Sequence, residues 1–222
     1  MEAYCPIKNV VHVSFDTQYQ CCSTFVRLQE FYESPIEGIR GKFFTLEQFM
    51  DAYSETKEHK SFSYFTDWGG FNLPCHAIDS FEDVFGRKLL EKEKQVLKLI
   101  RKTLKKNGYV SGDRFYVIGT FGGVESEEIV EHEIAHALFH LSPEYKKSVL
   151  EYIDFKICDA TFGKMRKVLL DKGYCEDVVL DEIQAYLSTG TSDYVFGSGY
   201  KTHREWFTKN FNKHRNLFLV NT

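Results

Sequence analysis

Two histidines four residues apart, with a glutamate beside the first, are the residues of this chain best suited to carry out chemistry. His132, Glu133 and His136 form the pattern His-Glu-x-x-His. On a helix, residues four apart share one face, so both imidazoles can bind one metal ion. Glu133 stands next to a ligand without being one, where it can accept a proton from a water molecule that the ion activates. The pattern therefore predicts a Zn²⁺ centre with Glu133 as its general base.

The segment around this pattern has the features of an independent helix. Ser126 is a good N-cap, and Glu127 and Glu128 would lie at the positive end of the helix dipole. An apolar stripe opposite the histidines consists of Val130, Ile134, Ala137, Leu138 and Leu141. We therefore expect a helix from Glu125 to Leu141 that buries the stripe and presents the two histidines together.

A catalytic zinc ion needs a third protein ligand and leaves one position for water. His140 follows one turn after His136, but three successive turns of one helix cannot easily surround one ion. Ser142 occupies the sixth position after His136, where the metzincin class of peptidases has its third histidine. Glu182, in the strongly helical segment 179–186, is the best candidate for the third ligand.

A His-Glu-x-x-His helix followed by a glutamate on a second helix resembles the gluzincin metallopeptidases. Ala185 fits this pattern, because a small side chain one turn after Glu182 lets the two helices approach closely. The resemblance covers residues 113–185, about a third of the chain, and its first motif is far more specific than its second. The separation of the two motifs is longer than in thermolysin and is closer to that in peptidases similar to anthrax lethal factor. The resemblance implies zinc held by His132, His136 and Glu182, and hydrolysis of a peptide bond.

Asp181 competes with Glu182 for the metal, since only one of two neighbouring residues can point at the ion. Glu182 is favoured because it is the residue with a small side chain, Ala185, at the third position after it. Asp181 would then hold the ring N–H of a histidine ligand, or face water.

A developing oxyanion needs a further hydrogen-bond donor, commonly a tyrosine or histidine from outside the zinc helix. Tyr174 lies eight residues before Glu182, close to the position of a catalytic tyrosine in enzymes that resemble lethal factor. The alternatives are Tyr186, Tyr194, Tyr200 and His203. Tyr194 and Tyr200 lie in a glycine-containing segment that a loop movement could bring to the site.

The rest of the chain predicts a mainly helical α+β fold with a small sheet. We expect strands at residues 9–15 and 113–121, and a strand with an aromatic loop at 60–75. Further helices are expected at residues 23–33, 45–56, 87–106, 143–156, 160–171, 176–189 and 202–217. The gluzincin resemblance implies that the strand at 113–121 is an edge strand above the zinc helix and pairs with an extended substrate.

The chain shows no internal repeat and no linker rich in proline, glycine or serine. We therefore expect one metallopeptidase-like domain over residues 1–222. Within it, residues 1–110 would form an N-terminal lobe or cleft wall, and residues 111–222 the zinc-binding half.

Composition and charge narrow the function classes. The 28 basic and 32 acidic residues give a net charge of −4, so nothing favours binding to nucleic acid or to an anionic membrane. The chain has no apolar run long enough to cross a membrane, and its first residues lack the basic and apolar parts of a signal peptide. We therefore expect a cytoplasmic protein, with export by a route that needs no such signal left open. Six cysteines without a Cys-x-x-Cys pair favour reduced thiols.

These patterns predict a zinc-dependent endopeptidase that acts on a peptide or protein. A zinc hydrolase of a non-peptide amide would use the same ion and base. A non-enzymatic binding protein with structural histidines, or with a metal that only joins two helices, is a second alternative. The segment 136–140 also resembles the end of the metal-binding helix in small intracellular peptidases that cut repressors, which adds a regulatory peptidase to the alternatives.

Overall fold

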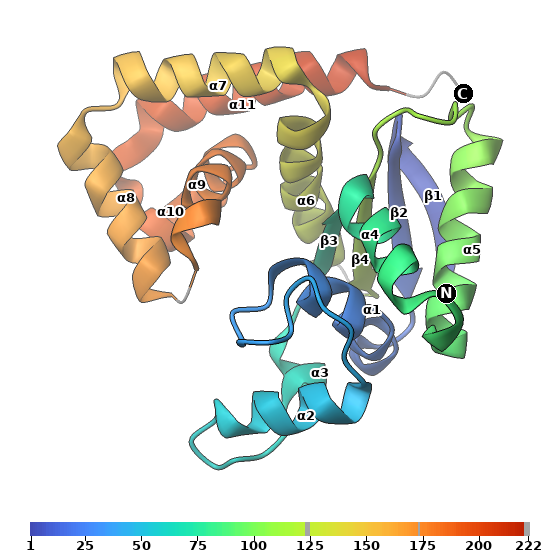
Figure 1. Ribbon diagram of the computed structural model, residues 1–222. Helices are drawn as coiled ribbons and strands as arrows, with labels where there is room; N and C mark the ends of the chain where they lie inside the picture. Colours follow the sequence, from blue (N-terminus) through green and yellow to red (C-terminus); the bar gives the residue numbers. More distant parts are fainter. Residues whose placement is uncertain (123–124, 173, 220–222) are drawn as a thin grey trace. The chain divides into compact units, whose positions relative to one another are not determined.

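The computed structural model describes residues 1–122, 125–172 and 174–219. The chain forms two compact units, Met1–Ser126 and Glu127–Thr222, and each is described by itself (Figure 1). The first unit extends beyond residue 110 and includes the strand that we placed in the zinc-binding half. The expectation of a single domain over residues 1–222 stays a prediction.

The N-terminal unit is built on a four-stranded mixed sheet with the strand order β1–β2–β4–β3. Its strands are β1 (Glu2–Ile7), β2 (Val10–Phe15), β3 (Phe71–Pro74) and β4 (Tyr116–Phe121). β1 pairs with β2 in antiparallel fashion, β2 runs parallel to β4, and β3 is antiparallel to β4. Together with the many helices, this sheet confirms the prediction of a mainly helical α+β fold.

The prediction that the strand before the zinc helix is an edge strand is wrong. β4 pairs with β2 along its whole length and with β3 from Tyr116 to Gly119, so it lies inside the sheet rather than at its edge. The edge strands of this sheet are β1 and β3. The reason lies in the sequence of β4, which is buried along almost its whole length and is therefore suited to the centre of a sheet.

Two long helices pack on the sheet of the N-terminal unit. α1 (Gln18–Glu33) contacts β3 and β4, and α5 (Glu91–Lys106) contacts β1 and β2. Phe25 of α1 lies directly on Gly119 of β4, where a Cβ atom would come 2.4 Å from the Phe25 ring. The glycine therefore allows the helix to approach the sheet closely.

A buried ion pair joins these two helices. Arg27 Nε donates to Glu93 Oε1 at 2.7 Å, and the two side chains are only 3% and 1% exposed. Glu93 also accepts the backbone N–H of Leu90 at the start of α5, at 2.7 Å. The remaining guanidinium N–H groups of Arg27 reach the backbone carbonyls of Phe44 and Lys88. The charges are therefore well supplied with hydrogen bonds in a dry environment.

The described part of the N-terminal unit also contains three shorter α-helices, α2 (Leu46–Glu55), α3 (Tyr64–Asp67) and α4 (Cys75–Phe85), and a 3₁₀ helix, η1 (Gly86–Lys88). The capping box predicted for α2 is confirmed, since Thr45 and Gln48 exchange both hydrogen bonds. The segment at 60–75, where we expected a strand and an aromatic loop, contains the strand β3 and also the short helix α3. Its fully buried Tyr64 packs edge-on against Phe49 and Tyr53 of α2. These rings therefore belong to the core of the unit.

All regular secondary structure in the described part of the C-terminal unit is helical. Its elements are α6 (Glu125–Leu141), α7 (Pro143–Lys156), α8 (Asp159–Asp171), α9 (Val179–Ser188), α10 (Ser192–Phe196) and α11 (Lys201–Leu217). α7 and α11 lie side by side, and α9 contacts α8, α10 and α11 (Figure 1). The predicted helices are confirmed here, although a 3₁₀ turn at Glu176–Val178 precedes α9. The side chains of Ser126 and Glu127, predicted to start the zinc helix, lie outside the described residues.

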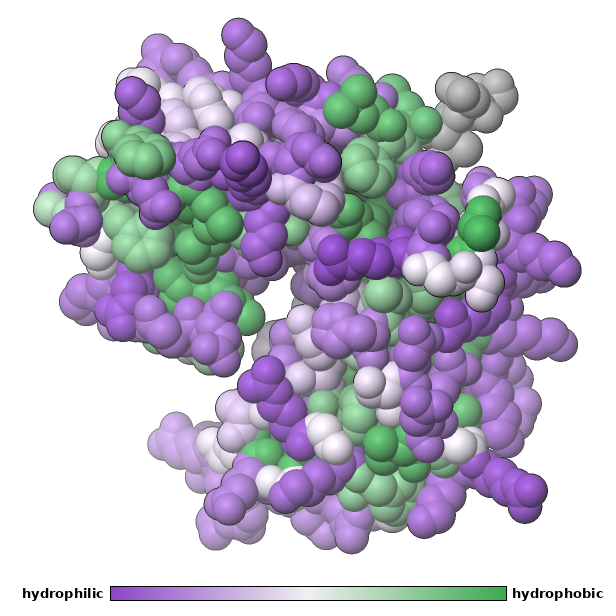
Figure 2. Space-filling model, turned by 45° about the horizontal axis from the view of Figure 1, so that its top comes forward, coloured by the Kyte–Doolittle hydropathy of each residue, from purple (hydrophilic) through white to green (hydrophobic). Residues whose placement is uncertain are grey.

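The surface of the protein is mostly hydrophilic on the face shown in Figure 2, with several groups of apolar side chains. Among the large apolar side chains, Phe155 and Tyr194 are 80% and 90% exposed. Within the described ranges, no helix combines the length and apolar character that a membrane span requires.

Candidate metal centre

Two helices of the C-terminal unit bring three potential metal ligands together. α6 presents His132 and His136 from successive turns, and their Nε2 atoms lie 3.1 Å apart. α9 presents Glu182, whose Oε2 lies 3.5 Å from His132 Nε2 and whose Oε1 lies 3.6 Å from His136 Nε2. One ligand atom from each of the three residues lies within 4.8 Å of the others. The three residues predicted as ligands therefore form one cluster.

The spacing of these atoms fits a metal ion. Ligand atoms at about 2.0–2.1 Å from a tetrahedral zinc ion lie about 3.3 Å from one another. The separation of the two Nε2 atoms, 3.1 Å, and the distances of 3.5 and 3.6 Å from them to the two different oxygens of Glu182 lie near that value. Glu182 Oε2 is buried and has no hydrogen-bond partner among the described residues. A buried carboxylate oxygen without a donor is costly, and a cation at this point would satisfy it.

Asp181 lies behind the cluster. Its Oδ1 atom is 3.0 Å from Nδ1 of His136, on the side of the ring away from the Nε2 that faces Glu182. A carboxylate in this position keeps the proton on Nδ1 and the lone pair on Nε2. Of the two alternatives for the neighbouring acids, the structure brings Glu182 to the ligand atoms and Asp181 to the opposite ring nitrogen.

The electrostatics of the cluster favour positive charge. Burial lowers the pKa of His136, but the charges of Asp181 and Glu182 and the hydrogen bond to Asp181 outweigh it and raise this pKa to about 10. A buried imidazole normally loses its proton more easily than an exposed one. The opposite shift here means that the surrounding carboxylates stabilise a cation, whether a proton or a metal ion.

Glu133 lies on the same helix as the two histidines and is buried, with 9% of its surface exposed. Its charge adds to those of Asp181 and Glu182 in raising the pKa of His136. The predicted base is therefore close enough to the cluster to act on it electrostatically.

Two tyrosines lie beside the cluster. The hydroxyl of Tyr174 is 2.9 Å from that of Tyr186, and the Tyr186 ring packs on His132 with a centroid distance of 4.6 Å. Burial, followed by the charge of Glu182, raises the pKa of Tyr174. Burial likewise raises the pKa of Tyr186. Both hydroxyls therefore keep their protons at neutral pH and can donate hydrogen bonds.

The other candidate donors have their described contacts elsewhere. Tyr194 is 90% exposed. The Tyr200 ring contacts Phe196 at 6.0 Å, and His203 Nδ1 is 3.1 Å from the Tyr152 hydroxyl. Of the candidate tyrosines, the structure therefore brings Tyr174 and Tyr186 together beside the cluster.

A polar network around Asp181 was not foreseen from the sequence. Gln184 donates to Asp181 Oδ1 at 2.9 Å, and the Tyr145 hydroxyl donates to Gln184 Oε1 at 2.8 Å. A sequence signal existed, because Gln184 interrupts the apolar face of α9 between Ile183 and Leu187. Tyr145, the partner of Gln184 on α7, gives no such signal, because the sequence does not distinguish a buried tyrosine with a functional hydroxyl from one that only packs in the core.

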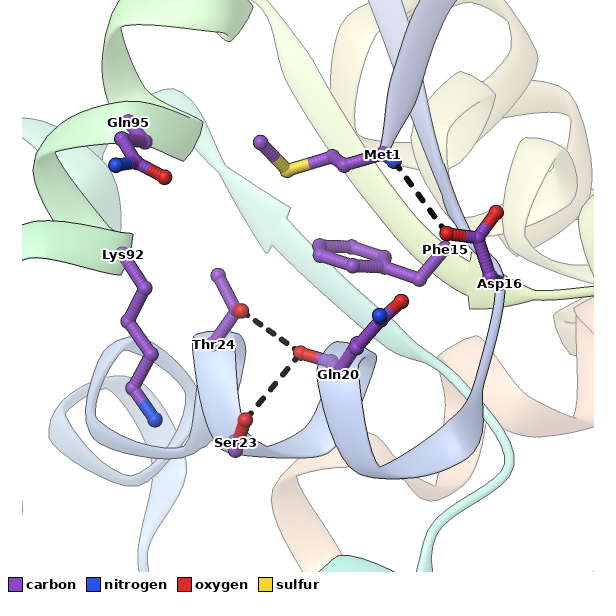
Figure 3. Close-up of a pocket in the computed structure, with 8 residues that line it drawn as sticks. All are labelled: Met1, Phe15, Asp16, Gln20, Ser23, Thr24, Lys92 and Gln95. Carbon is purple, nitrogen blue, oxygen red and sulfur yellow. Dashed lines mark hydrogen bonds and ion pairs between the residues drawn. The ribbon is translucent and has the colours of Figure 1, made fainter.

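A pocket in the N-terminal unit has a different character. It has a volume of about 270 Å³ and is lined by Met1, Phe15, Asp16, Gln20, Ser23, Thr24, Lys92 and Gln95. Figure 3 shows the Phe15 ring between Met1 and Thr24. The hydroxyls of Ser23 and Thr24 both donate to the backbone carbonyl of Gln20. Its lining contains no histidine or cysteine, so it offers no set of metal ligands comparable to that of the C-terminal unit.

No protein-family model, no curated protein and no solved structure matches this chain. The function must therefore be argued from the metal-binding group and the residues that surround it.

Proposed function

We propose that this chain is a zinc metallopeptidase of gluzincin type that cleaves a peptide or protein internally. The observation that carries the proposal is the convergence of His132, His136 and Glu182 in a chain whose motif supplies Glu133 beside them. Two imidazoles and one carboxylate are a common ligand set of catalytic zinc, and they leave the fourth position for water. A purely structural zinc site has four protein ligands, so a group of three among the described residues favours catalysis.

Zinc bound to these three residues would supply Lewis acidity, which makes water a nucleophile near neutral pH and polarises a carbonyl group. Glu133 removes a proton from the attacking water as the water oxygen adds to the carbonyl carbon of the substrate. As the C–N bond breaks, Glu133 passes that proton to the amine nitrogen. The carboxylate thus starts and ends the cycle ionised.

The tyrosine pair supplies a donor for the negative charge that develops on the carbonyl oxygen. Tyr174 fills this role in the proposal. Its hydroxyl is held by the hydroxyl of Tyr186, and the Tyr186 ring packs on His132. If Tyr186 donates its own proton to the Tyr174 oxygen, the Tyr174 proton is available to the substrate. A fixed donor of this kind stabilises the transition state without reorganisation.

Replacement of the base tests the proposal. Glu133→Gln should lower the rate of peptide hydrolysis about 10²- to 10⁴-fold, because the shape is kept and the proton acceptor is lost. Zinc content should remain one ion per chain, since Glu133 is not a ligand. Glu128→Gln is the matched control, because Glu128 is exposed on the same helix. Digestion of a peptide library by the wild-type chain is the activity measurement.

The same experiment separates the alternatives. Zinc binding with hydrolysis of small amides but no peptide cleavage would indicate a non-peptide amidohydrolase. Zinc binding without any Glu133-dependent hydrolysis would indicate a metal-stabilised binding protein. Wild-type activity in Glu133→Gln would overturn the proposed mechanism.

A further inference from the structure

Three buried polar side chains lead from Asp181 into the interior of the C-terminal unit. Gln184 Nε2 donates to Asp181 Oδ1 at 2.9 Å. Gln184 Oε1 accepts from the Tyr145 hydroxyl at 2.8 Å. The Tyr145 oxygen lies 2.9 Å from Oγ of Ser188. These bonds connect α7 to α9 and end on the carboxylate that holds His136.

The donor and the acceptor of each hydrogen bond in this series, from Ser188 to Asp181, follow from the chemistry of the groups. A carboxylate oxygen of Asp181 accepts only, so the amide of Gln184 must turn its NH₂ group towards it. The carbonyl oxygen of Gln184 then faces Tyr145, whose single proton is committed to that bond. Ser188 must therefore donate to the Tyr145 oxygen. All the hydrogen bonds run one way, towards Asp181.

Water cannot replace a side chain that is removed from this series of hydrogen bonds. Tyr145 and Gln184 are 0% exposed, and Ser188 is 1% exposed. Removal of the Tyr145 hydroxyl would leave the Gln184 carbonyl buried without a donor, and buried polar groups without partners are strongly disfavoured. The unpartnered carbonyl would favour a different rotamer of Gln184, in which its amide no longer donates to Asp181.

Packing and a backbone hydrogen bond hold Tyr145 in place. Tyr145 lies in the first turn of α7, where its backbone N–H donates to the capping Ser142 Oγ at 3.1 Å. Its ring packs against His214 and Phe211 of α11, with centroid distances of 5.4 and 6.5 Å. The hydroxyl is thus fixed by two helices that carry no metal ligand.

We propose that Tyr145 and Gln184 are positioning residues of the metal centre: they hold the Asp181 carboxylate so that His136 presents the lone pair of Nε2 to the ion. The inference rests on the metal centre of the proposed function, but it assigns a role to two residues that lie outside the motif. Residues that hold a ligand's partner commonly change metal affinity by 10- to 100-fold when they are replaced. The hydrogen bonds from Tyr145 through Gln184 to Asp181 therefore raise the affinity for zinc without contacting the ion.

The first measurement is the zinc affinity of the full chain, by competition with a fluorescent chelator at fixed pH. Tyr145→Phe, which removes one oxygen atom from the chain of hydrogen bonds, should weaken zinc binding by about tenfold. Gln184→Leu, which removes the contact to Asp181 itself, should weaken it at least as much. Ser188→Ala removes only the last donor and should weaken binding by less, about two- to threefold.

Tyr152→Phe is the matched control. Tyr152 also lies on α7, and its hydroxyl also has a side-chain partner, Nδ1 of His203 at 3.1 Å. That bond does not lead to Asp181, so zinc affinity should stay within twofold of the wild-type value.

A second readout separates positioning from a general structural role. Each variant is melted without zinc and with a fixed excess of zinc, and the rise in Tm caused by the metal is compared with that of the wild type. A positioning role predicts a smaller rise in Tyr145→Phe. A purely structural role predicts a lower Tm without zinc and an unchanged rise. Ser188→Ala carries the same comparison if Tyr145→Phe does not fold.

Each result decides the inference. Reduced affinity together with a reduced rise in Tm, and an unaffected Tyr152→Phe, supports it. Wild-type affinity in Tyr145→Phe and Gln184→Leu overturns the positioning role and leaves the metal centre of the proposed function intact. A wild-type chain that binds no zinc overturns both.

Discussion

Asp181 Oδ1 and His136 Nδ1 lie 3.0 Å apart, and this contact fixes which nitrogen of the ring faces the metal site. The adjacent residue, Glu182, approaches the other ring nitrogen of His136, with its Oε1 3.6 Å from Nε2. Neighbouring acids on one helix therefore act on opposite sides of the same imidazole. This division of roles leads to distinct predictions for the two acids.

Asp181→Asn should weaken zinc binding by about 10- to 100-fold without abolishing it, because the ring loses the charged partner that orients it. Chelator competition measures the change in affinity. Asp177→Asn, an exposed acid in the turn before α9, is the control and should leave affinity unchanged. Equal affinity in Asp181→Asn and the wild type would remove the orienting role.

Glu182→Gln should lose stoichiometric zinc at concentrations that saturate the wild type, since it removes a charged ligand rather than a partner of a ligand. Metal analysis after gel filtration is the measurement. Asp181→Asn is here the comparison, because it should still load fully in excess zinc. Full zinc occupancy in Glu182→Gln would show that the third ligand lies elsewhere.

Removal of zinc should destabilise the protein, because an ion held by His132, His136 and Glu182 would join α6 to α9 and would bind only the folded chain. At a free zinc concentration of about 100 times Kd, the linkage amounts to about 2.7 kcal/mol of unfolding free energy. Denaturant unfolding with and without a chelator measures this difference. The same measurement on Glu182→Gln should show almost no effect of zinc, and an equal effect in both chains would contradict binding at this site.

Tyr174→Phe should lower kcat about 10²- to 10³-fold with little change in KM or zinc content, as expected for a donor that acts in the transition state. Tyr186→Phe should have a smaller effect, because it removes only the bond that fixes Tyr174. Tyr194→Phe is the control, since that side chain is 90% exposed. If Tyr186→Phe were the more damaging variant, the roles within the pair would be reversed.

Arg27→Ala should destabilise the N-terminal unit by about 3–5 kcal/mol, because it leaves the buried Glu93 carboxylate without its charged partner. Urea unfolding measures the loss. The double variant Arg27→Met with Glu93→Leu removes both charges and should recover much of it. Similar losses in the single and double variants would show that packing of the arginine side chain, rather than its charge, provides the stability.

Local patterns predicted much of the helical structure. The capping pair Thr45 and Gln48 and the helix at 125–141 are set by residues within a few positions of one another, and the structure contains both elements. The neighbours of β4 were not predictable in this way. Its antiparallel partner β3 lies more than forty residues earlier in the chain, and pairing between distant strands leaves no local periodic signal.

The site was predictable where helix geometry decides it. The spacing of His132 and His136 places both on one face, and the small Ala185, which is fully buried, pointed to Glu182 rather than Asp181. The contact between Tyr174 and Tyr186 depends on the 3₁₀ turn that precedes α9, and no sequence motif predicted that turn. The link from Tyr145 to Gln184 depends on how two helices pack, so the sequence alone did not reveal it.

Zinc K-edge X-ray absorption of the chain purified without added metal is the most direct test of the central claim. A centre formed by His132, His136 and Glu182 predicts one zinc ion per chain with two imidazole nitrogens and two oxygens at about 2.0–2.1 Å, one of the oxygens from exchangeable water. The same measurement on His132→Ala should show one imidazole nitrogen fewer in the zinc shell. Absence of stoichiometric zinc, or a shell containing sulfur, would contradict the account.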